Sequence, residues 1–205
     1  MNVQPAILIV GPSGSGKTPL GERLAAAGLW GRRCEHFDFG ARLRAAAGGD
    51  NEAGLSDDQL AVVRGSLKTG ELLTDKQFPI AERILRAFLD RQALGPEDLL
   101  ILNGLPRHVG QAVAVEPIAD VGTLVFLNCP PEVAVERIRT NAGGDRDGRK
   151  DDNLVLVCAR QKVFAAETTP LVEHYGQRGA RVELLPVGPD TSAEELRREL
   201  EIRIR

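Results

Sequence analysis

The segment at residues 11–18, Gly-Pro-Ser-Gly-Ser-Gly-Lys-Thr, directly follows a short apolar run. It matches the phosphate-loop pattern G-x-x-x-x-G-K-[ST] at every fixed position, with Gly11, Gly16, Lys17 and Thr18 in place. The glycines let successive backbone N–H groups turn inward on a phosphate, and a helix beginning near Thr18 adds the positive end of its dipole. Lys17 then offers a mobile charge to the β and γ phosphates, and the Thr18 hydroxyl can ligate Mg²⁺. The spacing predicts a nucleoside triphosphate site rather than a glycine turn without a ligand.

A second polar position lies at the end of another apolar run, at residues 101–107, Ile-Leu-Asn-Gly-Leu-Pro-Arg. In a phosphate-loop protein the strand beside the first often ends in an aspartate that holds the Mg²⁺ shell. Asn103 occupies that place here, followed by Gly104 and Arg107. The segment therefore predicts a neutral residue at the metal and an arginine beside it.

The elements that must position these residues alternate between apolar runs and helical patterns, which is typical of βαβ units around a parallel sheet. We expect strands at residues 6–10, 34–38, 98–103, 123–128 and 181–187. Helical patterns cover residues 19–27, 74–94, 131–138 and 192–205, resume at 153, and occur twice in 41–69. Pro79 falls inside one pattern and is expected to kink that helix. Residues 140–150 are rich in glycine and charge, so we expect a mobile solvated loop.

Composition narrows the classes of function. The chain has 205 residues, of which 42% are apolar, enough for one domain with a sizeable core. A net charge of −3 does not favour nucleic-acid binding, and no apolar run approaches the ~18 residues of a membrane helix. The three cysteines are far apart and never in a C-x-x-C pair, which indicates reduced thiols and no zinc site. We expect a cytoplasmic protein without membrane or nucleic-acid partners.

Taken together, the motifs resemble those of the adenylate kinases, or more broadly the nucleoside monophosphate (NMP) kinases. Residues 36–44, His-Phe-Asp-Phe-Gly-Ala-Arg-Leu-Arg, are similar to the family's H-L-S-T-G-D-L-L-R, and residues 70–75 to its G-K-L-V-T-D. The pattern G-F-P-R-x-x-x-Q appears as residues 104–107 followed by Gln111. Residues 148–153 with Arg160 resemble the family's G-R-x-D-D-N and its second arginine.

The resemblance implies a role for each matching residue. The catalytic residues would be Lys17, Arg107, Arg149 and Arg160. ATP would be bound by Gly11, Ser13, Gly14, Ser15, Gly16, Lys17, Thr18, Arg137 and Gly188. The monophosphate would be bound by Phe39, Arg44, Leu73, Gly104, Arg107, Gln111, Arg149 and Arg160. Thr18 and Asn103 would hold Mg²⁺, largely through water, with ATP as co-substrate and no zinc.

Phosphoryl transfer explains why so many arginines are needed. ATP and a monophosphate bring roughly six negative charges into one cleft, so the acceptor oxygen approaches the γ phosphorus only if this repulsion is offset. Arginine suits the task because its planar fork grips two phosphate oxygens. The acceptor is already anionic, so no general base is obviously required. A closing lid would exclude water, the competing acceptor.

The resemblance also implies an architecture and a reaction. The fold would be α/β: a phosphate-loop (P-loop) NTPase-like, three-layer, parallel five-stranded sheet, with a helical NMP-binding insertion and a short lid. The core would comprise residues 1–38, 70–138 and 151–205, the insertion 39–69 and the lid 139–150. The expected reaction is reversible transfer of the ATP γ phosphate to AMP by a monomer. Transfer to another acceptor such as CMP, UMP or a deoxynucleotide is a second interpretation. A nucleotide-binding sensor without efficient turnover is a third.

Three departures from the family pattern bear on activity. Asn103 replaces an aspartate, so we expect reduced but not absent Mg²⁺-dependent activity, and Asn103→Asp should alter the rate or the Mg²⁺ dependence. Phe39 replaces a threonine, and its ring either stacks on an acceptor base or shrinks the pocket. Asn141 stands where the family has a phosphate-binding arginine, with Arg139 and Arg146 as candidate substitutes.

Overall fold

The computed structural model describes residues 3–146 and 154–203. Five parallel strands form one sheet in the order β2-β3-β1-β4-β5. The strands are β1 (Gln4–Val10), β2 (Cys34–Asp38), β3 (Leu99–Asn103), β4 (Ala119–Asn128) and β5 (Arg181–Pro186). This sheet confirms the predicted α/β fold, with β4 beginning earlier than expected.

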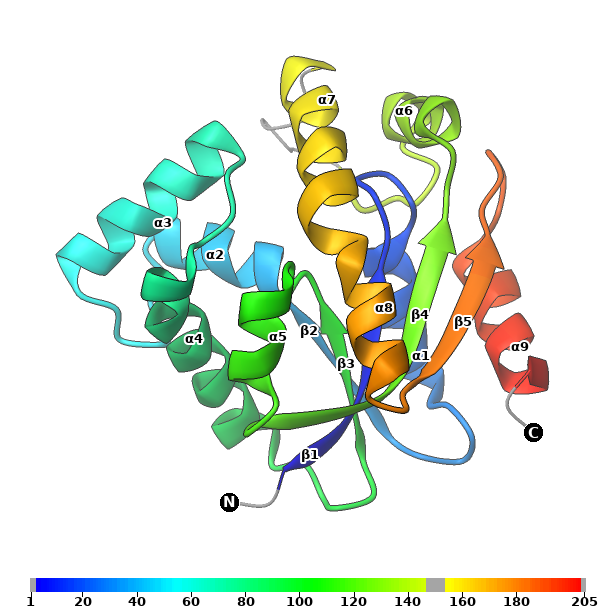
Figure 1. Cartoon of the computed structure of the whole chain (residues 1–205), viewed down its shortest axis with the longest axis horizontal. Helices are drawn as coiled ribbons and strands as arrows, with labels where there is room; N and C mark the ends of the chain where they lie inside the picture. The colour runs from blue at the N-terminus through cyan, green and yellow to red at the C-terminus, as the bar shows by residue number, and fades with distance from the viewer. Residues whose placement is uncertain (1–2, 147–153, 204–205) are drawn as a thin grey trace.

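The helices lie in the connections between the strands, except for α9, which follows the last strand (Figure 1). They are α1 (Lys17–Ala27), α2 (Phe39–Ala47), α3 (Asp57–Thr69), α4 (Phe78–Gln92), α5 (Val109–Val115), α6 (Pro131–Thr140), α7 (Leu154–Val163), α8 (Pro170–Gln177) and α9 (Ala193–Arg203). A 3₁₀ turn, η1 (Asp75–Gln77), precedes α4, and a π-helical turn, η2 (Phe164–Thr168), joins α7 to α8. In Figure 1 the strands point toward the end of the molecule where α6 and α7 lie.

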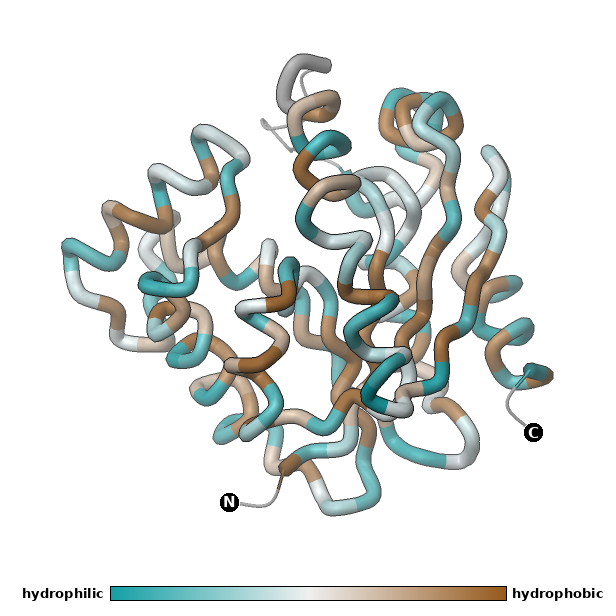
Figure 2. Tube along the Cα trace, in the orientation of Figure 1, coloured by the Kyte–Doolittle hydropathy of each residue, from teal (hydrophilic) through white to brown (hydrophobic). Residues whose placement is uncertain are grey.

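Both faces of the sheet are covered, which gives three layers. Along β1, Ala6, Leu8 and Val10 pack into one buried cluster, whereas Ile7 and Ile9 pack into another. The first cluster includes side chains of α2, α3, α4, α5 and α8, and the second includes those of α1 and α9. Figure 2 shows the central strands as largely hydrophobic segments. A strand buried on both faces needs apolar side chains at nearly every position, which explains the continuous apolar runs in the sequence.

The predicted kink at Pro79 is wrong. A capping box between Thr74 and Gln77 closes the 3₁₀ turn, and α4 then begins at Phe78. Pro79 consequently lies in the first turn of α4, where a backbone N–H has no helical partner to lose.

Helices α2 and α3 lie beside the sheet at one end of the molecule (Figure 1). Ser56 begins a Ser-Asp-Asp cluster that predicts a helix N-cap, and it caps α3 in a capping box with Gln59. Asp38 caps α2 by accepting a hydrogen bond from the Ala41 N–H. The assignment of residues 39–69 as an NMP-binding insertion and of 139–150 as a lid stays a prediction.

Two general features of the chain concern membranes and thiols. Within residues 3–146 and 154–203 there is no helix with the length and apolar character that a bilayer crossing requires. Cys34 and Cys129 are buried free thiols, and Cys158 is an exposed one.

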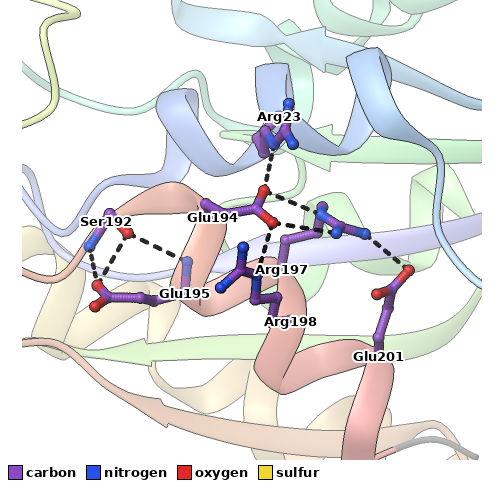
Figure 3. Close-up of polar contacts among 7 residues, drawn as sticks. All are labelled: Arg23, Ser192, Glu194, Glu195, Arg197, Arg198 and Glu201. Carbon is purple, nitrogen blue, oxygen red and sulfur yellow. Dashed lines mark hydrogen bonds and ion pairs between the residues drawn. The ribbon is translucent and has the colours of Figure 1, made fainter.

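An ion-pair network joins α9 to α1 (Figure 3). Glu194 accepts hydrogen bonds from Arg197, Arg23 and Arg198. These bonds, above all the one from Arg197, lower the pKa of Glu194 to about 2. Arg197 also pairs with Glu201, 2.8 Å away. Glu194 thus connects arginines of both helices.

Replacement of Glu194 by glutamine is expected to lower the melting temperature by about 1–3 °C at pH 7. Because folding lowers the pKa of Glu194, its stabilising effect is present above pH 4.5 and is lost as the pH falls toward 2. The difference between the variant and the parent protein should therefore shrink across that range. Thermal unfolding by circular dichroism measures it, with exposed Glu136→Gln as control. Equal melting temperatures at pH 7 would contradict the prediction.

Candidate nucleotide-binding site

One pocket lies where β1, β2 and β3 end. Its walls come from the phosphate loop, the two neighbouring strand ends, α2, the end of α3, and α7 with η2. The predicted site residues that line it are Gly11, Ser13, Gly14, Gly16, Lys17, Thr18, Arg44, Asn103, Gly104, Arg107 and Arg160. Parallel sheets bind ligands at this end because their loops and helix N-termini meet there.

Two glycines of the phosphate loop have backbone conformations that other residues rarely adopt. Gly14 has φ +91° and Gly16 has φ +93°. A Cβ at Gly14 would also lie 2.5 Å from the carbonyl oxygen of Ala134. Gly16 caps α1, so the N–H groups at the start of this helix face the loop. Ser15, within the loop, is fully buried and does not line the pocket.

Lys17 folds back onto its own loop. Its Nζ donates to the carbonyl oxygens of Gly11, at 2.7 Å, and Pro12, at 2.8 Å. Burial, followed by the neighbouring charges of Arg107 and Arg146, lowers the pKa of Lys17 to about 7. A phosphate in the loop would offset those positive charges, so it would favour the protonated amine.

Arg107 is held from several sides. Its Nε donates to the Gly104 carbonyl oxygen at 2.8 Å, and its guanidinium lies 5.9 Å from the centre of the Phe39 ring. Its own carbonyl oxygen accepts from the Thr168 hydroxyl at 2.7 Å. Burial lowers the pKa of Arg107, but an arginine pKa starts high enough that the charge persists at neutral pH. The result is a positioned cation in the pocket wall.

Three residues expected at the monophosphate lie behind the pocket wall. Phe39 is 1% exposed and stacks on Phe37. In this structure the ring packs against Arg107, and contact of Phe39 with an acceptor base stays a prediction. Gln111 is also 1% exposed, donates to the Leu73 carbonyl oxygen at 2.9 Å and accepts from the Arg107 N–H at 2.9 Å. Contacts of Gln111 and Leu73 with an adenine stay a prediction.

Arg137 ties the phosphate loop to the loop after β5. Its buried guanidinium donates to the carbonyl oxygens of Gly14, Gly188, Pro189 and Thr191. Neither Arg137 nor Gly188 lines the pocket. Their contact with the ATP adenine stays a prediction, whereas the support that Arg137 gives to the phosphate loop was not foreseen.

The remaining predicted arginines come from separate elements. Arg44 lies on α2 and Arg160 on α7, and both line the pocket with Arg107. Arg149 lies outside the described residues. The structure thus brings cations from three parts of the chain to the phosphate loop.

Sequence comparison relates this chain to known protein families. The AAA domain family matches residues 7–155. The chain is 31% identical over 201 residues to an adenylate kinase of Synechococcus sp. (strain WH7803), with 95% of this chain and 96% of that protein covered. The chain belongs to the adenylate kinase family. An adenylate kinase of Prochlorococcus marinus (strain MIT 9303) is 30% identical over 178 residues, covering 84% of this chain and 85% of its own.

A solved structure with a similar fold is that of a kinase with a different name from the relatives above. A gluconokinase from Sinorhizobium meliloti 1021 superposes with a TM-score of 0.54, covering 98% of this chain and 92% of its own, at 20% identity. At that identity the match shows the fold alone. The family assignment makes this protein an adenylate kinase-like phosphotransferase, which confirms the predicted enzyme class.

This member of the adenylate kinase family brings Arg146, and not Arg139, to the pocket. Asn141, where the family has an arginine, ends α6 with φ +50°. Its Oδ1 accepts from the Arg146 N–H at 3.2 Å. Arg146 lines the pocket, whereas Arg139 is exposed on α6. The turn at Asn141 therefore favours Arg146 as the substitute cation.

Alanine at Arg146 is expected to lower kcat/KM for ATP by about tenfold to a hundredfold, because a positive charge beside the phosphates is lost. Arg139→Ala is the matched control, since it removes the same group from an exposed position on the same segment. Steady-state kinetics at saturating acceptor measures both variants. Equal losses in the two variants would contradict the assignment of Arg146.

Beside Thr18, this adenylate kinase-type site holds a carboxylate that the sequence analysis did not assign to the site. The Thr18 hydroxyl donates to Asp38 Oδ2 at 2.6 Å, and Asn103 Nδ2 lies 3.2 Å from the same oxygen. Burial alone would raise the pKa of Asp38, but hydrogen bonds from Thr18 and the Ala41 N–H outweigh it and hold the pKa below its ordinary value. The signal was the position of Asp38 at the end of a predicted strand.

The residues present suit Mg²⁺. A hydroxyl, a carboxylate and an amide oxygen are hard ligands, and Mg²⁺ in phosphate sites uses one or two carboxylates with water and substrate oxygens. Thr18, Asp38 and Asn103 all line the pocket beside the phosphate loop. In the part of the chain that the structure describes, no group of three or more His, Cys, Asp or Glu side chains is arranged to hold a metal ion.

Proposed function

We propose that this protein transfers the γ phosphate of ATP reversibly to AMP, with Mg²⁺, to give two ADP. The observation that carries the proposal is one pocket in which the phosphate loop faces cations from four other segments. These cations are Arg44, Arg107, Arg146 and Arg160. Such an arrangement suits two phosphate-bearing substrates brought close together.

The residues of the chain divide the work. The loop N–H groups and Lys17 would bind the β and γ phosphates of ATP. Arg44 and Arg107 would bind the acceptor phosphate, and Arg160 would reach the transferred group from α7. Thr18, Asp38 and Asn103 would hold Mg²⁺, which when bound neutralises charge on the phosphates. Positioning and charge stabilisation suffice, because the acceptor oxygen is already anionic.

The acceptor nucleoside would contact the part of the pocket formed by α2 and the end of α3. Its apolar side chains are Leu43, Leu67 and Leu72, with Gly70 between them in the wall. Gly70 has φ +78° and ends α3, so the chain turns back beside the pocket there. Apolar side chains of this kind suit contact with a planar base. AMP is preferred because the relatives are adenylate kinases and because Gln111 is retained.

The test is diphosphate formation by the purified protein with ATP, Mg²⁺ and AMP, CMP, UMP, GMP or dTMP. Gluconate is included because the gluconokinase shares the fold. Lys17→Ala is the control for contaminating kinases. Turnover confined to AMP supports the proposal. Turnover with a different compound would instead identify that compound as the acceptor.

A nucleotide-binding sensor remains the second candidate. Its motivation is Asn103 and Asn141 at positions where the family has charged residues. Asp38 and Arg146 lie in the pocket near these positions, which favours turnover. Tight ATP binding without transfer to any compound of the panel would support the sensor.

A further inference from the structure

The strand ends beside the phosphate loop carry one carboxylate, but not on the strand where it was expected. In phosphate-loop proteins the loop Ser or Thr and an Asp at a neighbouring strand end hold Mg²⁺. β3 lies next to β1 and ends in Asn103. β2 lies one strand further out, pairs with β3 and ends in Asp38, with Asp38 directly opposite Asn103. Parallel register thus places the two side chains together at the pocket.

Hydrogen bonds connect both side chains to the loop threonine. The Thr18 hydroxyl donates to Asp38 Oδ2 at 2.6 Å. Asn103 Nδ2 lies 3.1 Å from Thr18 Oγ1 and 3.2 Å from Asp38 Oδ2. The amide of Asn103 therefore acts as a donor toward the carboxylate, and Asp38 is the anion of this trio.

We propose that Asp38 is the positioning carboxylate for Mg²⁺ in this protein, in place of an aspartate at 103. The inference rests on the proposed function, because it concerns the same site. Asp38 would orient the Thr18 hydroxyl toward the metal and accept hydrogen bonds from metal-bound water. Asn103 would be an uncharged hydrogen-bond donor to Asp38.

The other oxygen of Asp38 reaches the acceptor side of the pocket. Oδ1 accepts from the Ala41 N–H at 2.8 Å and so caps α2. Arg44 lies further along this helix and lines the pocket. One carboxylate thus fixes both the metal-facing hydroxyl and the start of the helix that carries an acceptor-site arginine.

This arrangement changes the expectation for Asn103→Asp. A carboxylate at 103 would lose the donor toward Asp38 and would place two like charges at hydrogen-bond distance. In the wild-type background, Asn103→Asp should therefore destabilise the site. In a variant without Asp38, the same substitution should restore the negative charge that the Asp38 carboxylate supplied. The effect of an aspartate at 103 is expected to depend on residue 38.

The experiment compares wild type, Asp38→Ser, Asn103→Asp and the double variant. Mn²⁺ serves as the metal probe, and its binding to each protein with a non-hydrolysable ATP analogue is followed by electron paramagnetic resonance. Asp38→Ser should weaken Mn²⁺ binding about tenfold to a hundredfold, and the double variant should recover most of that loss. Asn103→Asp alone should lower the melting temperature of the metal-free protein. It should also increase Mn²⁺ affinity less in the wild-type background than in the Asp38→Ser background.

Asp38→Asn separates charge from capping, because asparagine also caps helices well. It should keep the melting temperature near that of wild type and still weaken Mn²⁺ binding. Unchanged Mn²⁺ affinity in Asp38→Asn, or a double variant no better than Asp38→Ser, would overturn the proposal. Metal binding is measured without phosphoryl transfer. The Mn²⁺ result can therefore be interpreted even if no acceptor of the panel is phosphorylated.

Discussion

Arg107→Lys is expected to lower kcat by about 10²–10³-fold, while ATP affinity changes little. The guanidinium is fixed by its bond to the Gly104 carbonyl oxygen and by the Phe39 ring beneath it. A lysine keeps the charge but not the planar fork, so it cannot grip two phosphate oxygens while held in the same place. Pre-steady-state quench measurements with ATP and AMP give the rate of the transfer step.

Arg91→Lys is the matched control for Arg107. Arg91 lies on α4, pairs with Glu52 and does not line the pocket. Its replacement should leave kcat unchanged. If Arg107→Lys retained more than about a tenth of the wild-type rate, charge alone would suffice and the argument from geometry would be rejected.

Lys17→Ala is expected to lower kcat/KM by about a thousandfold or more, and to remove a pH dependence of ATP binding. With a pKa of about 7, Lys17 is largely neutral above that pH before ATP binds, and phosphate favours its protonated form. Binding must then take up a proton, so affinity should fall by up to about tenfold per pH unit above 7. Titration calorimetry in buffers of different ionisation enthalpy measures both affinity and proton uptake.

The alanine variant provides the control within the same experiment. It lacks the titrating amine, so its weaker ATP affinity should change little between about pH 7 and 9. The phosphates of ATP contribute equally to both proteins and cancel in the comparison. Parallel pH profiles for the two proteins would show that Lys17 is already protonated in the free state.

Local patterns predicted the parts of the site that a single segment determines. The phosphate loop needs glycines, a lysine and a threonine at fixed offsets, so the sequence was sufficient to locate it. The strands could be recognised because both faces of each central strand are buried. The cap at Ser56 could be recognised from residue types within its own segment.

Features that depend on contacts between distant segments could not be predicted in this way. Phe39 matches a motif position near the acceptor, but its ring packs against Arg107, which lies far from it in the sequence. The hydrogen bond of Gln111 to Leu73 joins two segments that only the fold brings together. The role proposed for Asp38 depends on the pairing of β2 with β3, which cannot be predicted from a motif within one segment.

The direct pairing of Asp38 with Asn103 has a consequence for how such a chain can change over generations. On the proposal above, moving the carboxylate from one strand end to the other requires two substitutions. The first step is unfavourable in either order: losing Asp38 weakens the metal site, and gaining an aspartate at 103 brings two like charges together. The two arrangements are then separate solutions divided by a less fit intermediate, and either one, once adopted, tends to persist.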